Sequence, residues 1–399
     1  MRWNWEQPDW PQFHWDRARL QQAEERFLFR SGVFAGTVKH LGPDEQEQLT
    51  IEAMGLEALT TSEIEGELLD RASVQSSLRR QLGLVCDERR VRPSEQGIAA
   101  MMIDLYRTYS DALTEETMFG WHRMVTMGRA DLRDIGCYRT ASEAMQVVSG
   151  ALVAPKVHFE APPSARVLVE MAGFVAWFNR TAPGGPEPLP AVTRAGLAHL
   201  YFESIHPFED GNGRIGRAIA EKALAQSAGL PTLTALAATI LIHRHEYYRD
   251  LAAANRSNDV NAWLCWFGGI VLEAQNRTEA EVEFLLNKAK LLDGLRGRIN
   301  PRQEKAVLRM LREGLSGFRG GLSAANHMTI TGASPATATR DLADLVEKGA
   351  LVRVGQLRHA RYLLGIGVRR VEAVRIAENG ELREEGASGA STGDTRREV

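Results

Sequence analysis

Hydrophobic positions recur at helical spacing along most of the chain. Between residues 17 and 81 they include Leu49, Ile51, Met54, Leu56, Leu59, Ile64 and Leu68. Apolar residues three or four positions apart share one face of a helix, so this segment predicts an N-terminal helical layer. Further helical stretches are predicted at residues 94–126, 165–179, 192–205, 214–228 and 263–286. The pattern therefore predicts a mainly α protein.

A β-hairpin is predicted at residues 147–163. Val157 and Phe159 alternate with polar neighbours, and Ser149 and Gly150 form a small-residue turn between the two predicted strands. Strict alternation is typical of a half-buried strand. The sequence therefore predicts a small β element within the otherwise helical core.

Tryptophan is concentrated at the N-terminus. Four of the eight tryptophans fall in the first fifteen residues, namely Trp3, Trp5, Trp10 and Trp15. Aromatic side chains bury large areas, so these residues are expected to pack into a core rather than to line a ligand or peptide groove.

The C-terminal part has a different character. Residues 301–362 contain ten Lys or Arg against five Asp or Glu. The expected elements are a helix, a turn and recognition helix at 331–345, and strands near 351–354 and 362–364 joined by a turn, which together predict a winged helix-turn-helix. The sequence then becomes acidic, Gly- and Ser-rich and poor in aromatic residues, which predicts a disordered tail.

These patterns divide the chain into four parts. We expect a Trp-rich helical domain at 1–94, a central helical domain with the hairpin at 95–290, a winged-helix domain at 298–366 and a disordered tail at 373–399.

Composition narrows the class of protein. A formal net charge of −3 gives no general attraction to nucleic acid or to an anionic membrane. Cys86, Cys137 and Cys265 lie far apart with no CxxC pair, which indicates a reducing cytoplasm rather than a disulfide framework. The N-terminus lacks the apolar segment of a signal peptide, and the chain contains no run of about 18 apolar residues. We therefore expect a cytoplasmic protein without a membrane span.

Candidate chemistry is concentrated in HPFEDGNGRIGR, residues 206–217, between two predicted helices. Gly211 and Gly213 flank Asn212 just before a helix, so backbone N–H groups can turn toward an anion at the positive end of the helix dipole. Arg214 and Arg217 are three positions apart and share one helical face, where their guanidinium groups can bind phosphate oxygens. The segment is typical of a phosphate site.

Two further residues of this segment suggest a reaction. Asp210 is placed to hold a Mg²⁺ ion that bridges phosphates. His206, followed by Pro207, is a candidate general base because imidazole titrates near neutral pH. The combination predicts phosphoryl or nucleotidyl transfer.

Other nucleotide and metal motifs fit less well. In an EF-hand, Asp210 and Asn212 would be the first and third ligands, but Arg214 occupies a ligand position and Ile215 replaces the required glycine. The chain contains neither a P-loop nor a kinase catalytic-loop signature.

HPFEDGNGRIGR resembles the signature of the Fic family, H-P-F-x-[D/E]-G-N-G-R-x-x-R, at every fixed position. The resemblance extends upstream to GCYR at 136–139 and to the hairpin, which corresponds to the family's target-docking flap, and downstream to HEYYRDL at 245–251. It implies a helical core that transfers AMP from Mg-ATP to a hydroxyl side chain of a target protein, or of the protein itself, and releases pyrophosphate.

The resemblance also implies roles for single residues. His206 would deprotonate the target hydroxyl, and Asp210 would hold Mg²⁺. The residues expected to bind ATP, besides His206, are Glu65, Gly211, Asn212, Gly213, Arg214, Ile215, Gly216, Arg217 and Tyr248, the last packing near the adenine.

An inhibitory segment is expected in TTSEIEGELLD, residues 60–70. It resembles the family's inhibitory motif, [S/T]-x-x-x-E-[G/N], through Thr61, Glu65 and Gly66. The resemblance implies that Glu65 pairs with Arg217 and keeps ATP from binding in a reactive pose. In related proteins the same glutamate positions water for the removal of AMP, so both directions of the reaction stay open for Glu65.

Several assignments stay open at the level of sequence. The C-terminal domain is similar to winged helices that bind DNA, with Arg340, Lys348, Arg353, Arg358 and Arg361 as phosphate contacts, but a protein interaction such as a homodimer is the alternative. The chain as a whole is expected to be an autoinhibited adenylyltransferase, or else a DNA-binding regulator whose core only senses nucleotide or modifies itself. Transfer of UMP, phosphate or phosphocholine, as in some family members, is not excluded.

Overall fold

The computed structural model describes residues 2–87, 89–149, 156–231, 234–318, 320–367 and 369–385. The chain forms two compact units, one made of residues 1–276 with 372–399 and the other of residues 277–371. Across the described ranges, none of the helices is both long enough and apolar enough to span a membrane.

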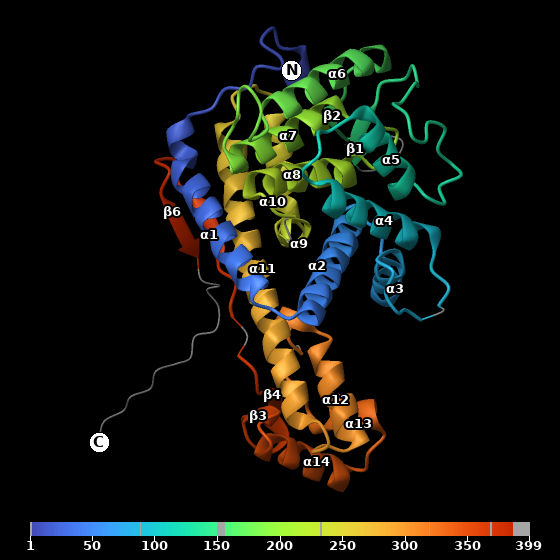
Figure 1. The fold of residues 1–399 in the computed structure, drawn as a ribbon, viewed down its shortest axis with the longest axis vertical. Helices are drawn as coiled ribbons and strands as arrows, with labels where there is room; N and C mark the ends of the chain where they lie inside the picture. The colour runs from blue at the N-terminus through green and yellow to red at the C-terminus, as the bar shows by residue number, and fades with distance from the viewer. Residues whose placement is uncertain are drawn as a thin grey trace. The chain divides into compact units, whose positions relative to one another are not determined.

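The larger unit is helical (Figure 1). Its helices are α1 Gln21–Lys39, α2 Pro43–Ile64, α3 Arg71–Gln81, α4 Pro93–Thr108, α5 Glu115–Val125, α6 Ser164–Arg180, α7 Ala191–Ile205, α8 Asn212–Ala228, α9 Leu236–Ile242, α10 Arg244–Ala254 and the first part of α11 Asn261–Leu295. The predicted helical layer and the helices predicted at 192–205 and 214–228 are confirmed, and the fold is mainly α as expected.

Helices α7 and α8 lie side by side at the centre of this unit (Figure 1). Every residue of α7 is buried. At the start of α7 the carboxylate of Glu24, from α1, accepts hydrogen bonds from the N–H groups of Val192 and Thr193, which satisfies donors that have no partner within the helix. Because α7 is enclosed on all sides, the loop that follows it has a fixed starting point.

The predicted hairpin forms from β1 Gln146–Ser149 and β2 Lys156–Glu160, which pair antiparallel. The turn predicted at Ser149 and Gly150 lies partly outside the described residues. Trp3 packs edge-on against Phe159 of β2, with ring centroids 5.2 Å apart, and the indole N–H of Trp5 donates to the carbonyl oxygen of Glu160. The N-terminal tryptophans therefore pack into the core, as expected.

The prediction of disorder from residue 373 is wrong for residues 373–385. These residues form a hairpin of β5 Ala373–Ile376 and β6 Leu382–Glu385, which lies beside α1 (Figure 1) and is joined to it by the Arg26–Glu384 ion pair. Val374 is buried and its backbone packs against Gly269 of α11, where an added Cβ would lie 2.4 Å from the Val374 oxygen. The prediction failed because this segment is polar on average, although its strand β5 contains alternating apolar residues and packs against Gly269.

The smaller unit contains the rest of α11, then α12 Pro301–Leu311, α13 Ala324–Thr331, α14 Pro335–Glu347, β3 Leu351–Val354 and β4 Arg361–Leu364. Its core includes Val307, Leu342, Leu345, Leu351 and Tyr362. Strands β3 and β4 pair antiparallel. The helices and strands expected between 301 and 364 are therefore present, while the winged-helix assignment itself stays a prediction.

The two units do not follow the predicted domain limits. Residues 1–94 belong to the same unit as the central helices, and the division falls at 276/277 instead of near 290. The physical reason is that α2 packs against α4, α8 and α9, and that α11 continues as one helix through the expected boundary.

Candidate active site

The backbone of the loop between α7 and α8 is held in place by its conformation and by side-chain hydrogen bonds. His206 ends α7 in the left-handed region with φ 49°, and Pro207 cannot continue the helix. The side chain of Asn212 accepts a hydrogen bond from the N–H of Phe208 and donates to its carbonyl oxygen, at 2.9 and 2.8 Å. Asn212 therefore stabilises the loop with its side chain, and only its backbone is available to an anion.

His206 is fixed by a buried arginine that belongs to the GCYR segment. The Nε of Arg139 donates to the carbonyl oxygen of His206 at 2.8 Å, and a terminal nitrogen donates to the carbonyl oxygen of Pro162, at the end of the hairpin. Burial and the charge of Arg139 lower the pKa of His206 to about 4. The imidazole is thus neutral at pH 7 and able to accept a proton.

We expect replacement of Arg139 by alanine to lower the free energy of unfolding by about 2 to 4 kcal/mol, because two buried carbonyl oxygens lose their donor. Urea denaturation measures the change. The matched control is Arg180→Ala, whose half-exposed side chain pairs with Glu187 and should contribute less than about 1 kcal/mol. Equal losses in the two variants would contradict the role assigned to Arg139.

The N-terminus of α8 has the backbone geometry expected of an anion site. Gly211 caps the helix with φ 84°, and the first N–H groups of a helix have no partner within it. The carboxylate of Glu65 lies against this end, since a Cβ added to Gly213 would be 2.3 Å from its Oε1. A negative group of the protein itself therefore occupies the place expected for a phosphate.

Glu65 also forms the ion pair expected with Arg217. A terminal nitrogen of Arg217 lies 2.7 Å from Glu65 Oε1, and Nε donates to the Thr61 hydroxyl at 2.7 Å. The Arg217 side chain is only 3% exposed, whereas the Glu65 side chain is 33% exposed, so only the arginine of this pair is shielded from water. Gly66 follows with φ 84°, a conformation that glycine adopts without strain and that turns the chain away after α2.

Arg214 and Asp210 also have internal partners. A terminal nitrogen of Arg214 lies 3.1 Å from Glu67 Oε2, and Asp210 forms an ion pair with Arg129. Burial opposes ionisation of Asp210, but the positive charge of Arg214 and the hydrogen bond from Arg129 outweigh it and lower its pKa. Neither Glu67 nor Arg129 was identified from the sequence.

Asp210 fits its expected role as a Mg²⁺ ligand in one respect. It is an ionised carboxylate beside the anion site, and Mg²⁺ is commonly bound by one or two carboxylates together with substrate phosphates and water. Among the described residues there is no group of three or more His, Cys, Asp or Glu that could hold a metal by itself. A metal at Asp210 would therefore depend on the substrate and would displace Arg129.

The other residues expected to bind ATP divide into two groups. The hydroxyl of Tyr248 donates to the carbonyl oxygen of Ile64 at 3.3 Å, which places Tyr248 beside the inhibitory segment at the site. Ile215 is fully buried in the core, and Gly216 faces α7, where an added Cβ would lie 2.5 Å from Glu203 Oε1. These positions direct Ile215 toward the core and the open side of Gly216 toward α7, and the expectation that the two residues contact ATP stays a prediction.

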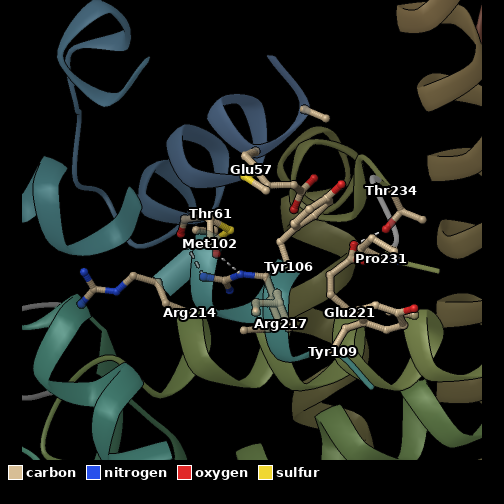
Figure 2. A pocket seen from close by; sticks show the side chains of 15 residues that line it. Glu57, Thr61, Met102, Tyr106, Tyr109, Arg214, Arg217, Glu221, Pro231 and Thr234 are labelled. Carbon is tan, nitrogen blue, oxygen red and sulfur yellow. Dashed lines mark hydrogen bonds between the residues drawn. The ribbon is translucent and has the colours of Figure 1, made fainter. Parts of the chain in front are cut away.

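A small cavity lies behind Arg217, between α2, α4 and α8 (Figure 2). It has a volume of about 40 Å³ and is lined by side chains that include Glu57, Tyr106 and Glu221. Burial and the nearby charge of Glu221 raise the pKa of Glu57. A cavity of this size holds a few water molecules and is too small for a nucleotide.

The fold is shared with a solved structure of the same size. The crystal structure of a Fic family protein from Desulfovibrio desulfuricans G20 matches 90% of this chain and 99% of its own, with a TM-score of 0.51 and 21% identity. Helical architecture and the loop between α7 and α8 thus define a protein with a Fic-type fold.

Sequence comparison finds family matches in two parts of the chain. Residues 112–224 match the Fic/DOC family, and residues 3–84 match a domain of unknown function, DUF4172. The chain therefore carries a Fic/DOC family domain, as the resemblance implied.

Curated relatives are similar over part of their length. Protein adenylyltransferase fic-1 of Caenorhabditis briggsae is 34% identical over 136 residues, which are 34% of this chain and 22% of that protein. Protein adenylyltransferase Fic of Culex quinquefasciatus is 28% identical over 200 residues, 49% of this chain and 36% of that protein. The chain thus spans about a quarter to a third of these relatives.

Proposed function

We propose that the protein is an autoinhibited adenylyltransferase that transfers AMP from Mg-ATP to a hydroxyl side chain of a protein. The observation that carries the proposal is the position of the Glu65 carboxylate, between the N-terminus of α8 and Arg217. An internal carboxylate at this place marks a site built for an anion. The names of the curated relatives, which are protein adenylyltransferases, support the choice of reaction.

The transfer is a displacement at the α-phosphorus of ATP. The target hydroxyl gives its proton to His206 and forms a bond to the α-phosphorus, while the bond from that phosphorus to the pyrophosphate oxygen breaks and pyrophosphate leaves with the electron pair. Backbone N–H groups at Asn212 and Gly213, with Arg214 and Arg217, stabilise the charge on the phosphate oxygens. Asp210 would hold Mg²⁺, which neutralises further phosphate charge when bound.

Inhibition follows from competition for one arginine. ATP phosphates and the Glu65 carboxylate both require Arg217 and the end of α8, so only one of them can be fully bound. While Glu65 is in place, ATP is restricted to a pose that does not expose its α-phosphorus to the target. The same carboxylate, beside the site, is suited to position water for removal of AMP, and we include this reverse activity in the proposal.

The test of the reaction is mass spectrometry of the Glu65→Gly protein after incubation with Mg-ATP, with cell lysate as a source of targets. A mass gain equal to AMP on this protein or on a target supports the proposal. Nucleotide binding without any transfer would instead favour a nucleotide-sensing regulator, and UTP and GTP tested in parallel define the nucleotide. Binding of DNA by residues 298–366 and formation of a homodimer stay predictions.

Glu67 is expected to have a smaller effect than Glu65. The Glu67 side chain is 37% exposed in its pair with Arg214, and pairs of this kind contribute about 0.2 to 1 kcal/mol. Glu67→Gln should therefore increase the affinity for Mg-ATP by no more than about fivefold. Calorimetric titration measures the affinity, with Glu63→Gln, an exposed residue on the last turn of α2, as the control of equal charge. Equal affinities of the two variants for Mg-ATP would show that Glu67 takes no part in the inhibition.

A further inference from the structure

Three titratable side chains follow one another along a single face of α7. His199, Glu203 and His206 are spaced by four and three positions, which brings them onto the same side of a helix. His199 is fully buried and Glu203 is 6% exposed. A buried acid one turn before the candidate base is costly unless it interacts with its neighbours.

The contacts of Glu203 point to His206. Its Oε2 lies 3.7 Å from Nδ1 of His206, slightly beyond hydrogen-bond length. Catalytic hydrogen bonds are often long in the absence of substrate and shorten in the reactive complex. The His206 ring also has a hydrogen bond with the backbone of Glu203, so the main chain and the carboxyl group of Glu203 both interact with this ring. Since Nδ1 faces the Glu203 carboxyl group, the other ring nitrogen, Nε2, is the one left for the target hydroxyl.

The surroundings hold Glu203 in this position. Gly216 of α8 lies directly against the carboxyl group, and an added Cβ would be 2.5 Å from Oε1. The same Cβ would be 3.2 Å from Nδ1 of His199, whose Nε2 is 2.9 Å from the hydroxyl of Tyr247. Oε1 of Glu203 and Nδ1 of His199 are both buried without a hydrogen-bond partner among the described residues. Two buried polar atoms thus share the space beside Gly216.

We propose that Glu203 is the positioning residue of His206. It accepts a hydrogen bond from Nδ1–H, which keeps the lone pair of His206 on Nε2, and it stabilises the imidazolium that forms when the target hydroxyl gives up its proton. This arrangement follows the general logic of a base oriented by a carboxylate. The inference rests on the proposed transfer for its kinetic consequences, whereas the state of the His206 ring can be measured without any reaction.

The charge of Glu203 depends on the inhibitory segment. The titratable groups near it are His199 and His206 on α7, Arg217 on α8, Tyr247 on α10, and Glu65 after α2. Burial and the negative charge of Glu65 raise the pKa of Glu203 to about 8, against the opposing effect of Arg217. The acid is therefore mostly neutral at pH 7 while Glu65 is bound, and removal of Glu65 lowers the pKa and favours the carboxylate. Release of Glu65 would free Arg217 and ionise the partner of His206 together.

The kinetic test compares Glu65→Gly with Glu65→Gly/Glu203→Gln. In the parent, the rate of AMP transfer should rise with pH as Glu203 ionises. With Glu203→Gln the maximal rate should fall by about 10- to 1000-fold and this rise should disappear, while the KM for ATP stays within twofold. Ser204→Ala is the matched control, because Ser204 is buried on the same helix but bonds to Asn4 and Asn255. A rate within twofold of the parent, with the same pH profile, overturns the proposal.

A second measurement separates this inference from the proposed function. ¹⁵N NMR of labelled histidine, assigned with His206→Ala, reports the tautomer of His206 in the folded protein without nucleotide. We expect the Nδ1–H form in Glu65→Gly and loss of its predominance with Glu203→Gln. Circular dichroism verifies that both variants fold. Gly216→Ala, whose added Cβ would lie 2.5 Å from Glu203 Oε1 and would displace the carboxyl group, replaces Glu203→Gln if the latter does not fold. An unchanged tautomer overturns the inference even if AMP is transferred, and an absence of transfer with a changed tautomer overturns only the reaction.

Discussion

Replacement of Glu65 by glycine is expected to raise the rate of AMP transfer by about 10²-fold. Glu65 occupies the end of α8 and the guanidinium of Arg217 together. Loss of one partner from a buried ion pair corresponds to about 3 to 5 kcal/mol. Because Glu65 itself is one-third exposed, we take the lower end of that range, which is about two powers of ten in an equilibrium constant.

The measurement is incorporation of AMP from ATP labelled at the α-phosphate, in the wild type and in Glu65→Gly. Glu65→Gln distinguishes charge from size, since it retains the side-chain volume but not the ion pair, and it should give an intermediate rate. Glu63→Gln is the charge control. An unchanged or reduced rate in Glu65→Gly would remove the inhibitory role from Glu65.

The local sequence predicted the loop well because its chemistry is contained in consecutive residues. The glycines at 211 and 213 indicated a close approach of an anion to the backbone, and the structure brings a carboxylate to Gly213. The ion pair of Glu65 with Arg217 joins residues 152 positions apart and came from the resemblance to the Fic family. Periodicity alone would not have identified it.

The contacts missed by sequence reasoning depend on packing between distant helices. Arg129 reaches the loop from the segment after α5, and nothing in its immediate sequence distinguishes it from a surface arginine. Arg139 lies in the GCYR segment that the resemblance singled out, but its contact with the His206 carbonyl oxygen was not predicted. Glu67 is two positions after Glu65, and no sequence pattern indicated that it contacts Arg214. Glu203 could have been noticed, because it lies three residues before a candidate base in a mostly apolar segment, and an acid is unusual at a buried position.

Outside the site, the sequence predicted the positions of the helices better than the boundaries of the domains. Helical periodicity located α7 and α8 to within a few residues, since each has an apolar face and a defined end. The division at residue 276 could not be found in this way, because α11 has no break there. The hairpin at 373–385 was missed because a few apolar residues that pack on Gly269 have little weight in an average composition.

Replacement of His206 by alanine, made in the Glu65→Gly protein, is expected to lower AMP transfer by about 10²- to 10⁴-fold, the contribution of a positioned general base. His206 is neutral at pH 7 because burial and Arg139 lower its pKa to about 4, so it is in the proton-accepting form. In the proposed site, Asn212, Gly213 and Arg217 would provide the phosphate contacts independently of the imidazole. Affinity for Mg-ATP should therefore stay within about threefold, a difference of less than 1 kcal/mol.

Transfer and binding have to be measured on the same preparation to separate these effects. Incorporation of labelled AMP measures the rate of transfer, and calorimetric titration measures the affinity for Mg-ATP. His245→Ala, an exposed histidine on α10, controls for loss of an imidazole elsewhere and should change neither quantity. Transfer at the parent rate in His206→Ala would show that another group takes the proton of the target hydroxyl, whereas loss of binding together with transfer would assign His206 to the nucleotide site instead of to the base.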